Sequence, residues 1–239
     1  MFAVVNQKGG VAKSTLAVHL AVWHLETGRR VAFIDADGQS SSSRWITAAG
    51  WPLTLVTETR ADAIIEEALR LRSTHDVVVA DGPANLAEST RALLLVADFA
   101  VVPCGVSLTD LESTACTIRM LENARRVRAD SLPSGCLVLT RVRDKRCILT
   151  REAHQAATRL GLPLLSRFLP LREAVADAPG QRSVVWNMGA KAKQASNEMK
   201  LLLTEIHDYA DRETNRHRNP DQRGEVLPLS NPPARGVAV

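Results

Sequence analysis

The sequence predicts an α/β fold in which a twisted, mostly parallel β-sheet carries helices on both faces. Short β-branched runs alternate with longer helical patterns along the chain, an order that is typical of βαβ units. These runs lack the polar alternation of a half-exposed strand, as expected for strands that are covered on both faces. The chain has 239 residues, of which 45% are hydrophobic, and it is therefore long enough for one substantial domain.

The expected elements follow one another in regular alternation from the N-terminus. Strands are expected at residues 3–5, 31–34, 77–80, 99–102 and 137–139, and helices at 16–26, 109–128, 151–160 and 190–209. The long helix is expected to begin at Thr109, because Thr109 and Glu112 fit a capping box. It is expected to end near Arg128, ahead of Pro133, which cannot continue a helix.

A change in composition near residue 210 marks the expected end of the domain. Residues 1–209 are predicted to form one ordered domain, whose last helix ends near Tyr209. Residues 210–239 mix charges of both signs with prolines and have no apolar period. They are expected to form a flexible, charged and proline-rich tail.

Composition and charge disfavour several classes of protein. No apolar run approaches the roughly 20 residues that cross a bilayer, and the N-terminus lacks the order of a secretion signal, so a cytoplasmic protein is expected. The four cysteines form no C-x-x-C pair, which argues against disulfide and metal roles. The net charge of +4 is mild and does not by itself indicate nucleic-acid binding.

The segment NQKGGVAKST, residues 6–15, lies between an apolar strand and a helical pattern, where a phosphate-binding loop is expected. Gly9 and Gly10 allow the backbone amides to converge on phosphate oxygens, and the following helix presents its positive end. Lys13 would then reach the β- and γ-phosphates, and the Ser14 hydroxyl would bind Mg²⁺. The alternative is a glycine turn that merely joins a strand to a helix; it leaves the joint occurrence of Gly-Gly, Lys and Ser-Thr unexplained.

Lys8, just ahead of the glycines, is the unusual residue of this loop. A second cation near the γ-phosphate would stabilise charge on the transferring phosphoryl group. The run KGGVAKST resembles the deviant Walker A signature of the ParA/MinD family of ATPases. The resemblance implies a P-loop NTPase fold of the deviant Walker A type, with ATP and Mg²⁺ as cofactors. It also implies that Lys8 crosses a nucleotide-sandwich homodimer, formed on ATP binding, to touch the partner's ATP.

One position of the loop departs from the common pattern of the family. Ala12 stands where many members have glycine, and it would be strained if that position needs a positive φ. The residues that the resemblance places on the nucleotide are Lys8, Gly9, Gly10, Val11, Ala12, Lys13, Ser14, Thr15, Asp81 and Gly82, and catalytic roles fall to Lys8, Lys13 and Asp37.

Two acidic motifs follow in the order of the family. The run VAFIDADGQ resembles its second acidic motif, which usually has proline where Gly38 stands. The resemblance implies that Asp37 orients the attacking water and that Asp35 supports the Mg²⁺ shell. Phosphoryl transfer needs a positioned water more than a strong base, which agrees with this role. The alternative for both acids is a solvent-facing loop, and the order of the motifs disfavours it.

The run VVVADGPA resembles a Walker B strand, an apolar strand that ends in an acid. Asp81 would hold Mg²⁺ through water, and Gly82 would let the backbone approach the γ-phosphate. This motif is weak by itself, because many strands end in aspartate. With Ser14 and Asp35, Asp81 completes the expected metal site.

The resemblance covers roughly residues 1–209 and is nearest to the short plasmid-partition ATPases of the ParA family, the ParF-like proteins. A strand that begins at Phe2 leaves no room for a preceding helix-turn-helix, so operator binding is not expected. By resemblance, the nucleobase packs near Thr140 and Arg141 and near a proline-containing loop at Pro170. Arg141 is equally compatible with a surface charge or a DNA contact.

Relatives of this type bind DNA non-specifically as ATP-bound dimers through basic side chains of the C-terminal half. Such contacts to phosphate need only a cluster of cations and weaken steeply with salt. The alternative is a solvated helical face. The candidate DNA-binding residues are Arg143, Lys145, Arg146, Arg151, Arg182, Lys191, Lys193 and Lys200.

The resemblance implies an ATP-dependent positioning or partition ATPase that sits on the nucleoid and hydrolyses ATP when a ParB-like or other small adaptor stimulates it. The cargo is open between a plasmid, a carboxysome-like compartment and a receptor cluster. A second class is a membrane-cycling, MinD-like cell-division regulator, which needs a C-terminal amphipathic helix. The prolines after residue 219 argue against such a helix and against a membrane partner. A third class comprises metabolic or iron-sulfur ATPases, and the iron-sulfur carriers use cysteine pairs that are absent here.

Overall fold

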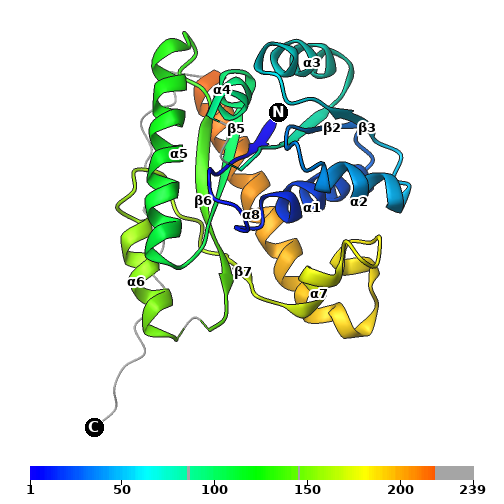
Figure 1. Ribbon diagram of the computed structural model, residues 1–239, viewed down its shortest axis with the longest axis vertical. Helices are drawn as coiled ribbons and strands as arrows, with labels where there is room; N and C mark the ends of the chain where they lie inside the picture. The colour runs from blue at the N-terminus through cyan, green and yellow to red at the C-terminus, as the bar shows by residue number, and fades with distance from the viewer. Residues whose placement is uncertain (85–86, 145, 219–239) are drawn as a thin grey trace.

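The computed structural model describes residues 1–84, 87–144 and 146–218, and a seven-stranded sheet forms its centre (Figure 1). The strand order is β3-β2-β4-β1-β5-β6-β7, and each pair of neighbours is parallel. The predicted parallel α/β sheet is therefore confirmed. The strands are β1 (Phe2–Val4), β2 (Val31–Asp35), β3 (Thr54–Thr57), β4 (Val77–Asp81), β5 (Phe99–Cys104), β6 (Ser134–Val142) and β7 (Leu169–Pro170).

Helices cover both faces of this sheet, as predicted (Figure 1). They are α1 (Lys13–Glu26), α2 (Ser41–Ala49), α3 (Ala61–Thr74), α4 (Ala87–Val96), α5 (Leu108–Val127), α6 (Ile148–Ala157), α7 (Glu173–Asp177) and α8 (Lys193–Arg218), with short 3₁₀ turns η1 (Val185–Asn187) and η2 (Ala190–Ala192). Side chains of β1 and of Val5, directly after it, alternate between two buried clusters, with Phe2 and Val4 in one and Ala3 and Val5 in the other. Side chains of α1, α2, α7 and α8 complete the first cluster, and those of α3, α4, α5 and α6 complete the second.

The predicted strands are present with shifted ends, but the edge strand β3 was not predicted. Its outer threonines are exposed, and Leu55 and Val56 are only half-buried. An apolar run that is buried on both faces is the pattern that reveals a parallel strand, and β3 lacks it. The helices α2, α3, α4 and α7 and the other edge strand, β7, were also not predicted from the sequence.

The long helix α5 has nearly the predicted bounds, but its predicted cap is wrong. Ser107 is the N-cap: its hydroxyl accepts from the Asp110 N–H at 3.2 Å, and the Asp110 carboxylate accepts from the Ser107 N–H at 3.2 Å. Thr109 and Glu112 lie inside the helix instead. Both pairs have the same spacing, so the pattern alone does not choose between them.

The last helix, α8, continues past the predicted end at Tyr209 and runs to Arg218. Tertiary contacts support this extension. The Tyr209 ring packs on Phe99 with ring centroids 5.9 Å apart, and the His217 ring lies 2.9 Å from the Ser134 hydroxyl. The remainder of the predicted tail, residues 219–239, lies outside the described residues.

Candidate functional site

The loop that follows β1 lies at the carboxyl ends of the parallel strands, where open α/β sheets bind ligands. The buried side chain of Asn6 anchors its start. Asn6 Nδ2 donates to the carbonyl of Pro103 at 2.8 Å and to the Thr114 hydroxyl at 2.9 Å. Asn6 Oδ1 accepts from the Lys8 N–H at 2.9 Å and from the Ser113 hydroxyl at 3.1 Å. These bonds fix the loop to β5 and α5.

Lys13 opens α1, and its ammonium group turns back onto the loop. Its Nζ donates to the carbonyl of Lys8 at 2.8 Å, and the side chain is almost fully buried. Burial lowers the pKa of Lys13, and the charges of Asp81 and Asp37 act in the opposite direction. A buried cation whose one hydrogen bond goes to a neutral carbonyl favours the binding of an anion beside it.

The backbone of the loop takes up left-handed conformations at Gly10 (φ 75°) and at Ala12 (φ 67°, ψ 29°). Glycine adopts such a φ without cost, whereas alanine pays roughly 1–2 kcal/mol for it. The strain expected for a positive φ at Ala12 is therefore present. It lies directly before the first turn of α1.

Two acidic side chains meet at the ends of β2 and β4, which pair in register so that Asp35 lies opposite Asp81. Both are fully buried. The Ser42 hydroxyl, in the first turn of α2, donates to Asp81 Oδ2. Asp81 Oδ1 has no hydrogen-bond partner among the described residues. A buried carboxylate oxygen without a partner is costly, which marks a position that a ligand would complete.

Burial raises the pKa of Asp81 to about 7, and Asp35 adds to this rise. The hydroxyls of Ser14 and Ser42 and the charge of Lys13 oppose it. A divalent cation at this carboxylate would remove the penalty on its charged form. The described part of the chain contains no cluster of three or more His, Cys, Asp and Glu side chains that would cage a metal by itself. A single carboxylate with a hydroxyl and substrate phosphates is the donor set typical of Mg²⁺, and these residues fit it.

Asp35 is engaged by protein donors at both oxygens. Its Oδ1 accepts from the Asp37 N–H at 3.1 Å, and its Oδ2 accepts from the Ser43 N–H at 2.8 Å and the Ser43 hydroxyl at 2.7 Å. Asp35 therefore fixes both the loop that carries Asp37 and the start of α2. Asp37 itself is partly exposed, and its carboxylate accepts from the Gln39 N–H at 3.0 Å.

A cleft of about 470 Å³ joins these parts of the chain. The phosphate-binding loop and the start of α1 line it together with Asp37, and Pro170 and Leu171 after β7 line its other side. Among the predicted site residues, Gly9, Gly10, Ala12, Lys13, Ser14, Thr15, Asp37 and Pro170 line the cleft, and Lys8, Val11, Asp35, Asp81, Gly82, Thr140 and Arg141 do not.

Lys8 turns away from Lys13 and towards the start of α5. Its Nζ donates to the Thr109 hydroxyl at 3.1 Å and lies 4.0 Å from Asp110 Oδ1. The side chain is 40% exposed. The acid and the hydroxyl hold its charge beside the loop.

Thr140 and Arg141, at the end of β6, hold the loop from the other side. The buried Thr140 hydroxyl donates to the carbonyl of Val11 at 3.1 Å. Arg141 has a positive φ of 57°, and its guanidinium donates to the carbonyl of Gly10 at 3.2 Å. Of the three predicted nucleobase residues, Thr140 and Arg141 therefore contact the backbone of the phosphate-binding loop, and Pro170 lines the cleft.

The backbone after β4 approaches β1 closely at Gly82. Its N–H donates to the carbonyl of Val4 at 2.9 Å, and a Cβ added at Gly82 would lie 2.8 Å from Val5 Cγ1. Only glycine fits here, because the crowding atoms belong to the neighbouring strand segment. This crowding explains why the Walker B-like run has glycine at this position.

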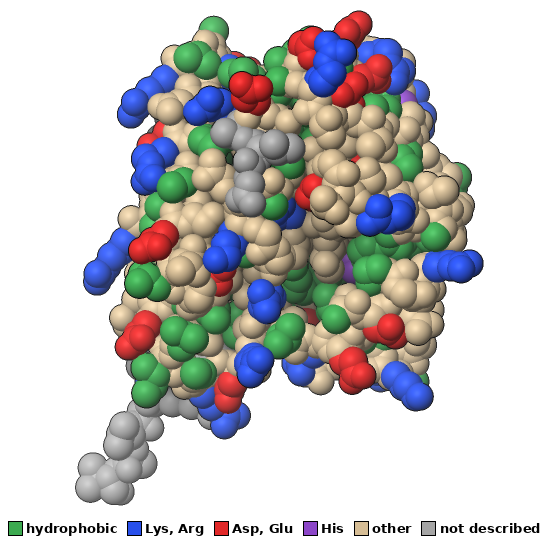
Figure 2. All heavy atoms as spheres, in the orientation of Figure 1, with side chains coloured by type: hydrophobic (Ala, Val, Ile, Leu, Met, Phe, Trp, Pro, Cys, Tyr) green, Lys and Arg blue, Asp and Glu red, His purple; other side chains and the backbone are tan. Residues whose placement is uncertain are grey.

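The predicted DNA-binding residues fall into two groups, one around α6 and one around α7, η2 and α8. These two regions lie on either side of β7 (Figure 1). Figure 2 shows Lys and Arg side chains dispersed over this face, with acidic and hydrophobic side chains between them. Lys145 lies outside the described residues. The others are exposed: Arg143, Arg146, Arg151, Arg182, Lys191, Lys193 and Lys200.

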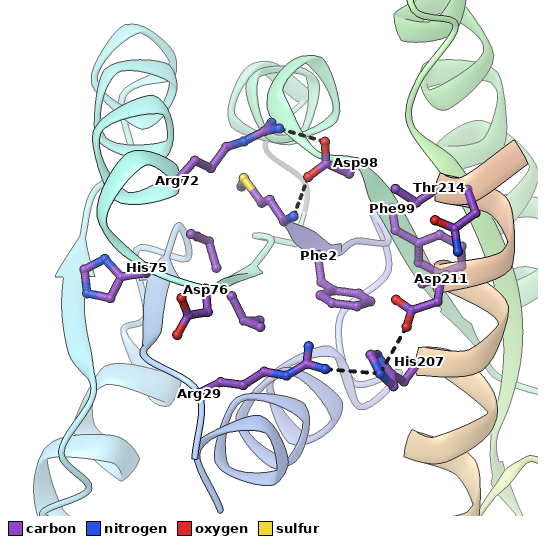
Figure 3. A pocket seen from close by; sticks show the side chains of 15 residues that line it. Phe2, Arg29, Arg72, His75, Asp76, Asp98, Phe99, His207, Asp211 and Thr214 are labelled. Carbon is purple, nitrogen blue, oxygen red and sulfur yellow. Dashed lines mark hydrogen bonds and ion pairs between the residues drawn. The ribbon is translucent and has the colours of Figure 1, made fainter. Parts of the chain in front are cut away.

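A second hollow, of about 480 Å³, lies at the amino ends of β1, β4 and β5, away from the phosphate-binding loop (Figure 3). Its lining carries charges of both signs. Arg72 pairs with Asp98 at 2.8 Å, and His207 lies 3.3 Å from Asp211 (Figure 3). The acids Asp76, Asp98 and Asp211 line it beside Arg29 and Arg72, so cations do not dominate its lining.

Sequence reasoning missed the residues that hold the site in place. Asn6, Ser42 and Ser43 bind the loop and the two acids through side-chain hydrogen bonds. The serine run of residues 40–43, directly after the second acidic motif, was an available signal, since serines are frequent at helix starts. Among the described residues, no helix combines the length and apolar character needed to cross a membrane.

Comparisons with known proteins agree with this geometry. Residues 2–185 match the model of the CobQ/CobB/MinD/ParA nucleotide binding domain. The chain is 29% identical over 210 residues to the maintenance of carboxysome distribution protein A of Halothiobacillus neapolitanus, covering 85% of this chain and 94% of the relative. It is 28% identical to the chromosome-partitioning ATPase Soj of Thermus thermophilus over 211 residues, covering 74% and 83%. The structure of a Cyanothece McdA variant with ATP shares the fold, with a TM-score of 0.71 and 14% identity over 86% of this chain and 95% of that one.

Proposed function

The chain belongs to the CobQ/CobB/MinD/ParA family of nucleotide-binding domains, and we propose that it is a Mg²⁺-dependent ATPase that positions a cargo. One observation carries the proposal. A single cleft brings the buried cation of Lys13 and the hydroxyl of Ser14 together with the acid Asp37, beside the incompletely partnered carboxylate of Asp81. This is the set of groups that phosphoryl transfer requires.

In the proposed phosphoryl transfer, each group has one role. The amides of the loop and Lys13 bind the β- and γ-phosphates, and Ser14 and Asp81 hold the Mg²⁺ ion. When bound, Mg²⁺ would neutralise charge on the phosphates. Asp37 orients the attacking water, and Asp35 acts indirectly by fixing the Asp37 backbone at 3.1 Å.

The proposed dimer depends on Lys8. Its side chain is 40% exposed, and among the described residues it is held by Thr109 and, at 4.0 Å, by Asp110. We infer that ATP binding brings two copies together, and that Lys8 of each then contacts the nucleotide of the other. A cation that arrives only in the dimer makes hydrolysis depend on assembly.

The names of the relatives support a positioning role and leave the cargo open between compartments and DNA. Carboxysome distribution and chromosome partitioning occur among similar proteins, so carboxysome-type positioning is at least as well supported as plasmid partition. In both cases we infer that the ATP-bound dimer resides on the nucleoid through the exposed basic residues. An adaptor carried by the cargo then stimulates hydrolysis and release.

Co-sedimentation with DNA at graded salt, with ATP, ADP or no nucleotide, tests the proposal. Pelleting should require ATP and should fall steeply with salt, as expected for phosphate contacts. Asp37→Ala should keep the protein on DNA, because it binds ATP without hydrolysing it. ATP hydrolysis that is normal in Asp37→Ala would contradict the role given to Asp37.

A charge reversal locates the DNA-binding surface. Arg143→Glu should lower DNA affinity and the salt slope while ATP hydrolysis without DNA stays at its original rate. The matched control is Arg91→Glu on α4, an exposed arginine on a helix that carries none of the predicted contacts. Equal losses of DNA affinity in both variants would indicate a net-charge effect and would rule out this surface.

A further inference from the structure

The two acidic motifs are joined by a buried hydrogen-bond network that passes through the first turn of α2. Ser42 donates to Asp81 Oδ2, and the next residue, Ser43, donates to Asp35 Oδ2 from both its N–H (2.8 Å) and its hydroxyl (2.7 Å). The Ser43 hydroxyl also lies 2.8 Å from the Thr57 hydroxyl of β3. One helical turn therefore contacts the ends of both acid-bearing strands.

The two oxygens of Asp81 differ because of this network. Oδ2 is occupied by the Ser42 hydroxyl, whereas Oδ1 is buried and has no partner among the described residues. A carboxylate that rotates freely about its last bond would present either oxygen in several directions. Ser42 is fully buried, and its hydrogen bond selects one orientation.

Ser42 has no other role in the proposed site. It does not line the cleft, and among the described residues its hydroxyl hydrogen bond goes to Asp81. Its neighbour Ser43 is the residue that engages Asp35. The Ser42 hydroxyl is thus directed to the one carboxylate that the proposed function gives to the metal.

From this geometry we propose that Ser42 is a positioning residue for the Mg²⁺ site: it fixes Asp81 through Oδ2 so that Oδ1 remains available to the shell of the ion. The inference rests on the proposed function. Residues that orient metal-binding groups from behind typically change metal affinity by about 10–100-fold when they are removed.

The test is a titration of Mg²⁺ with a fluorescent ATP analogue, in the full chain and in Ser42→Ala, at a protein concentration that binds only part of the analogue without Mg²⁺. The Mg²⁺ concentration that gives half-maximal tightening of nucleotide binding should rise by about 10-fold in Ser42→Ala. Nucleotide affinity in the presence of EDTA should stay unchanged, because the Ser42 hydroxyl bonds to Asp81 and not to the phosphate-binding loop. A merely structural role would lower both affinities together.

Two matched variants accompany the measurement. Thr47→Ala removes a hydroxyl from an exposed position of the same helix and should leave the Mg²⁺ midpoint unchanged. Ser42→Cys keeps a side-chain atom in place with a weaker donor, and it should shift the midpoint in the same direction as Ser42→Ala. Ser42→Cys also tests the inference if Ser42→Ala does not fold.

The outcomes separate the inference from the function on which it rests. If the unchanged protein shows no tightening of nucleotide binding by Mg²⁺, the proposed function fails. If the unchanged protein responds to Mg²⁺ and both Ser42 variants keep its midpoint, Ser42 does not position Asp81. Equal loss of nucleotide affinity with Mg²⁺ and with EDTA also overturns the inference.

Discussion

At the scale of single residues, the backbone of Ala12 is the clearest conflict between sequence and structure. Its φ of 67° costs an L-residue roughly 1–2 kcal/mol, whereas glycine gives up about 0.5–1 kcal/mol of stability through the unfolded state. We expect Ala12→Gly to raise the free energy of unfolding by about 0.5–1 kcal/mol. Chemical denaturation without nucleotide measures this change.

A matched control for Ala12→Gly is Ala48→Gly, the same substitution at an exposed position inside α2. There the residue is helical, so the free energy of unfolding should fall by about 1 kcal/mol. Opposite signs in the two variants are the expected result. A loss of stability at both positions would show that the left-handed backbone at Ala12 is not a source of strain.

The buried ring of His24 links stability to pH. Burial, reinforced by the charges of His207 and Arg29, lowers its pKa to about 3. The unfolded chain takes up a proton on this histidine below about 6.5, while the folded chain does not until about 3. The unfolded state therefore binds more protons in this window, and the free energy of unfolding falls as pH is lowered through it.

His24→Leu should remove this share of the pH dependence. Neither ring nitrogen of His24 has a hydrogen-bond partner among the described residues, so at pH 7.5 the variant should be more stable by about 1 kcal/mol. At pH 5 the gain should grow to roughly 2–3 kcal/mol. Denaturant titrations at the two pH values provide the comparison, and an equal change at both would refute the link.

At the scale of secondary structure elements, the start of α5 contains two candidate capping boxes with the same spacing, Ser107 with Asp110 and Thr109 with Glu112. Ser107→Ala should lower the free energy of unfolding by about 1 kcal/mol, because the hydroxyl accepts from the Asp110 N–H at 3.2 Å. Glu112→Ala, which removes an exposed side chain from the helix, should change it by less than about 0.5 kcal/mol. Thermal or chemical denaturation measures both changes. A larger loss of stability in Glu112→Ala than in Ser107→Ala would show that the helix is capped at Thr109.

Elements with a strong pattern were predictable, and those defined by tertiary contacts were not. The strand runs that end in Asp35 and Asp81 are apolar throughout, because both faces of the sheet are covered. The edge strand β3 is half-exposed and carries no such signal. The end of α8 depends on packing between Tyr209 and Phe99, two residues that are far apart in the sequence. Local propensity alone does not contain that contact.

The site shows the same division. The groups that would meet phosphate were predictable, since Lys13 and Ser14 belong to one continuous run with a fixed mechanical role. The groups that hold them were not. Asn6 reaches α5 more than 100 residues away, and Ser42 reaches β4, so their roles depend on how the chain folds. Supporting hydrogen bonds of this kind leave no short motif.

At the scale of the whole molecule, we propose that Lys8 connects the site of one copy to the assembly of two. Its ammonium group lies beside Thr109 on a half-exposed side chain, whereas Lys13 is buried. Removing Lys8 should therefore leave nucleotide binding by the single chain intact. It should prevent the dimer, because the contact to the second nucleotide is lost.

Sedimentation velocity with ATP and Mg²⁺, in an Asp37→Ala background that slows hydrolysis, tests this separation. Asp37→Ala alone should sediment as a dimer, and Asp37→Ala with Lys8→Ala should stay monomeric while it still binds the fluorescent ATP analogue. Lys13→Ala is the comparator, since it removes the buried cation of the cleft and should abolish nucleotide binding as well as dimerisation. A dimer that forms equally well without Lys8 would mean that other contacts join the subunits. Assembly and catalysis would then be independent, and the proposed cycle would lose the step that couples them.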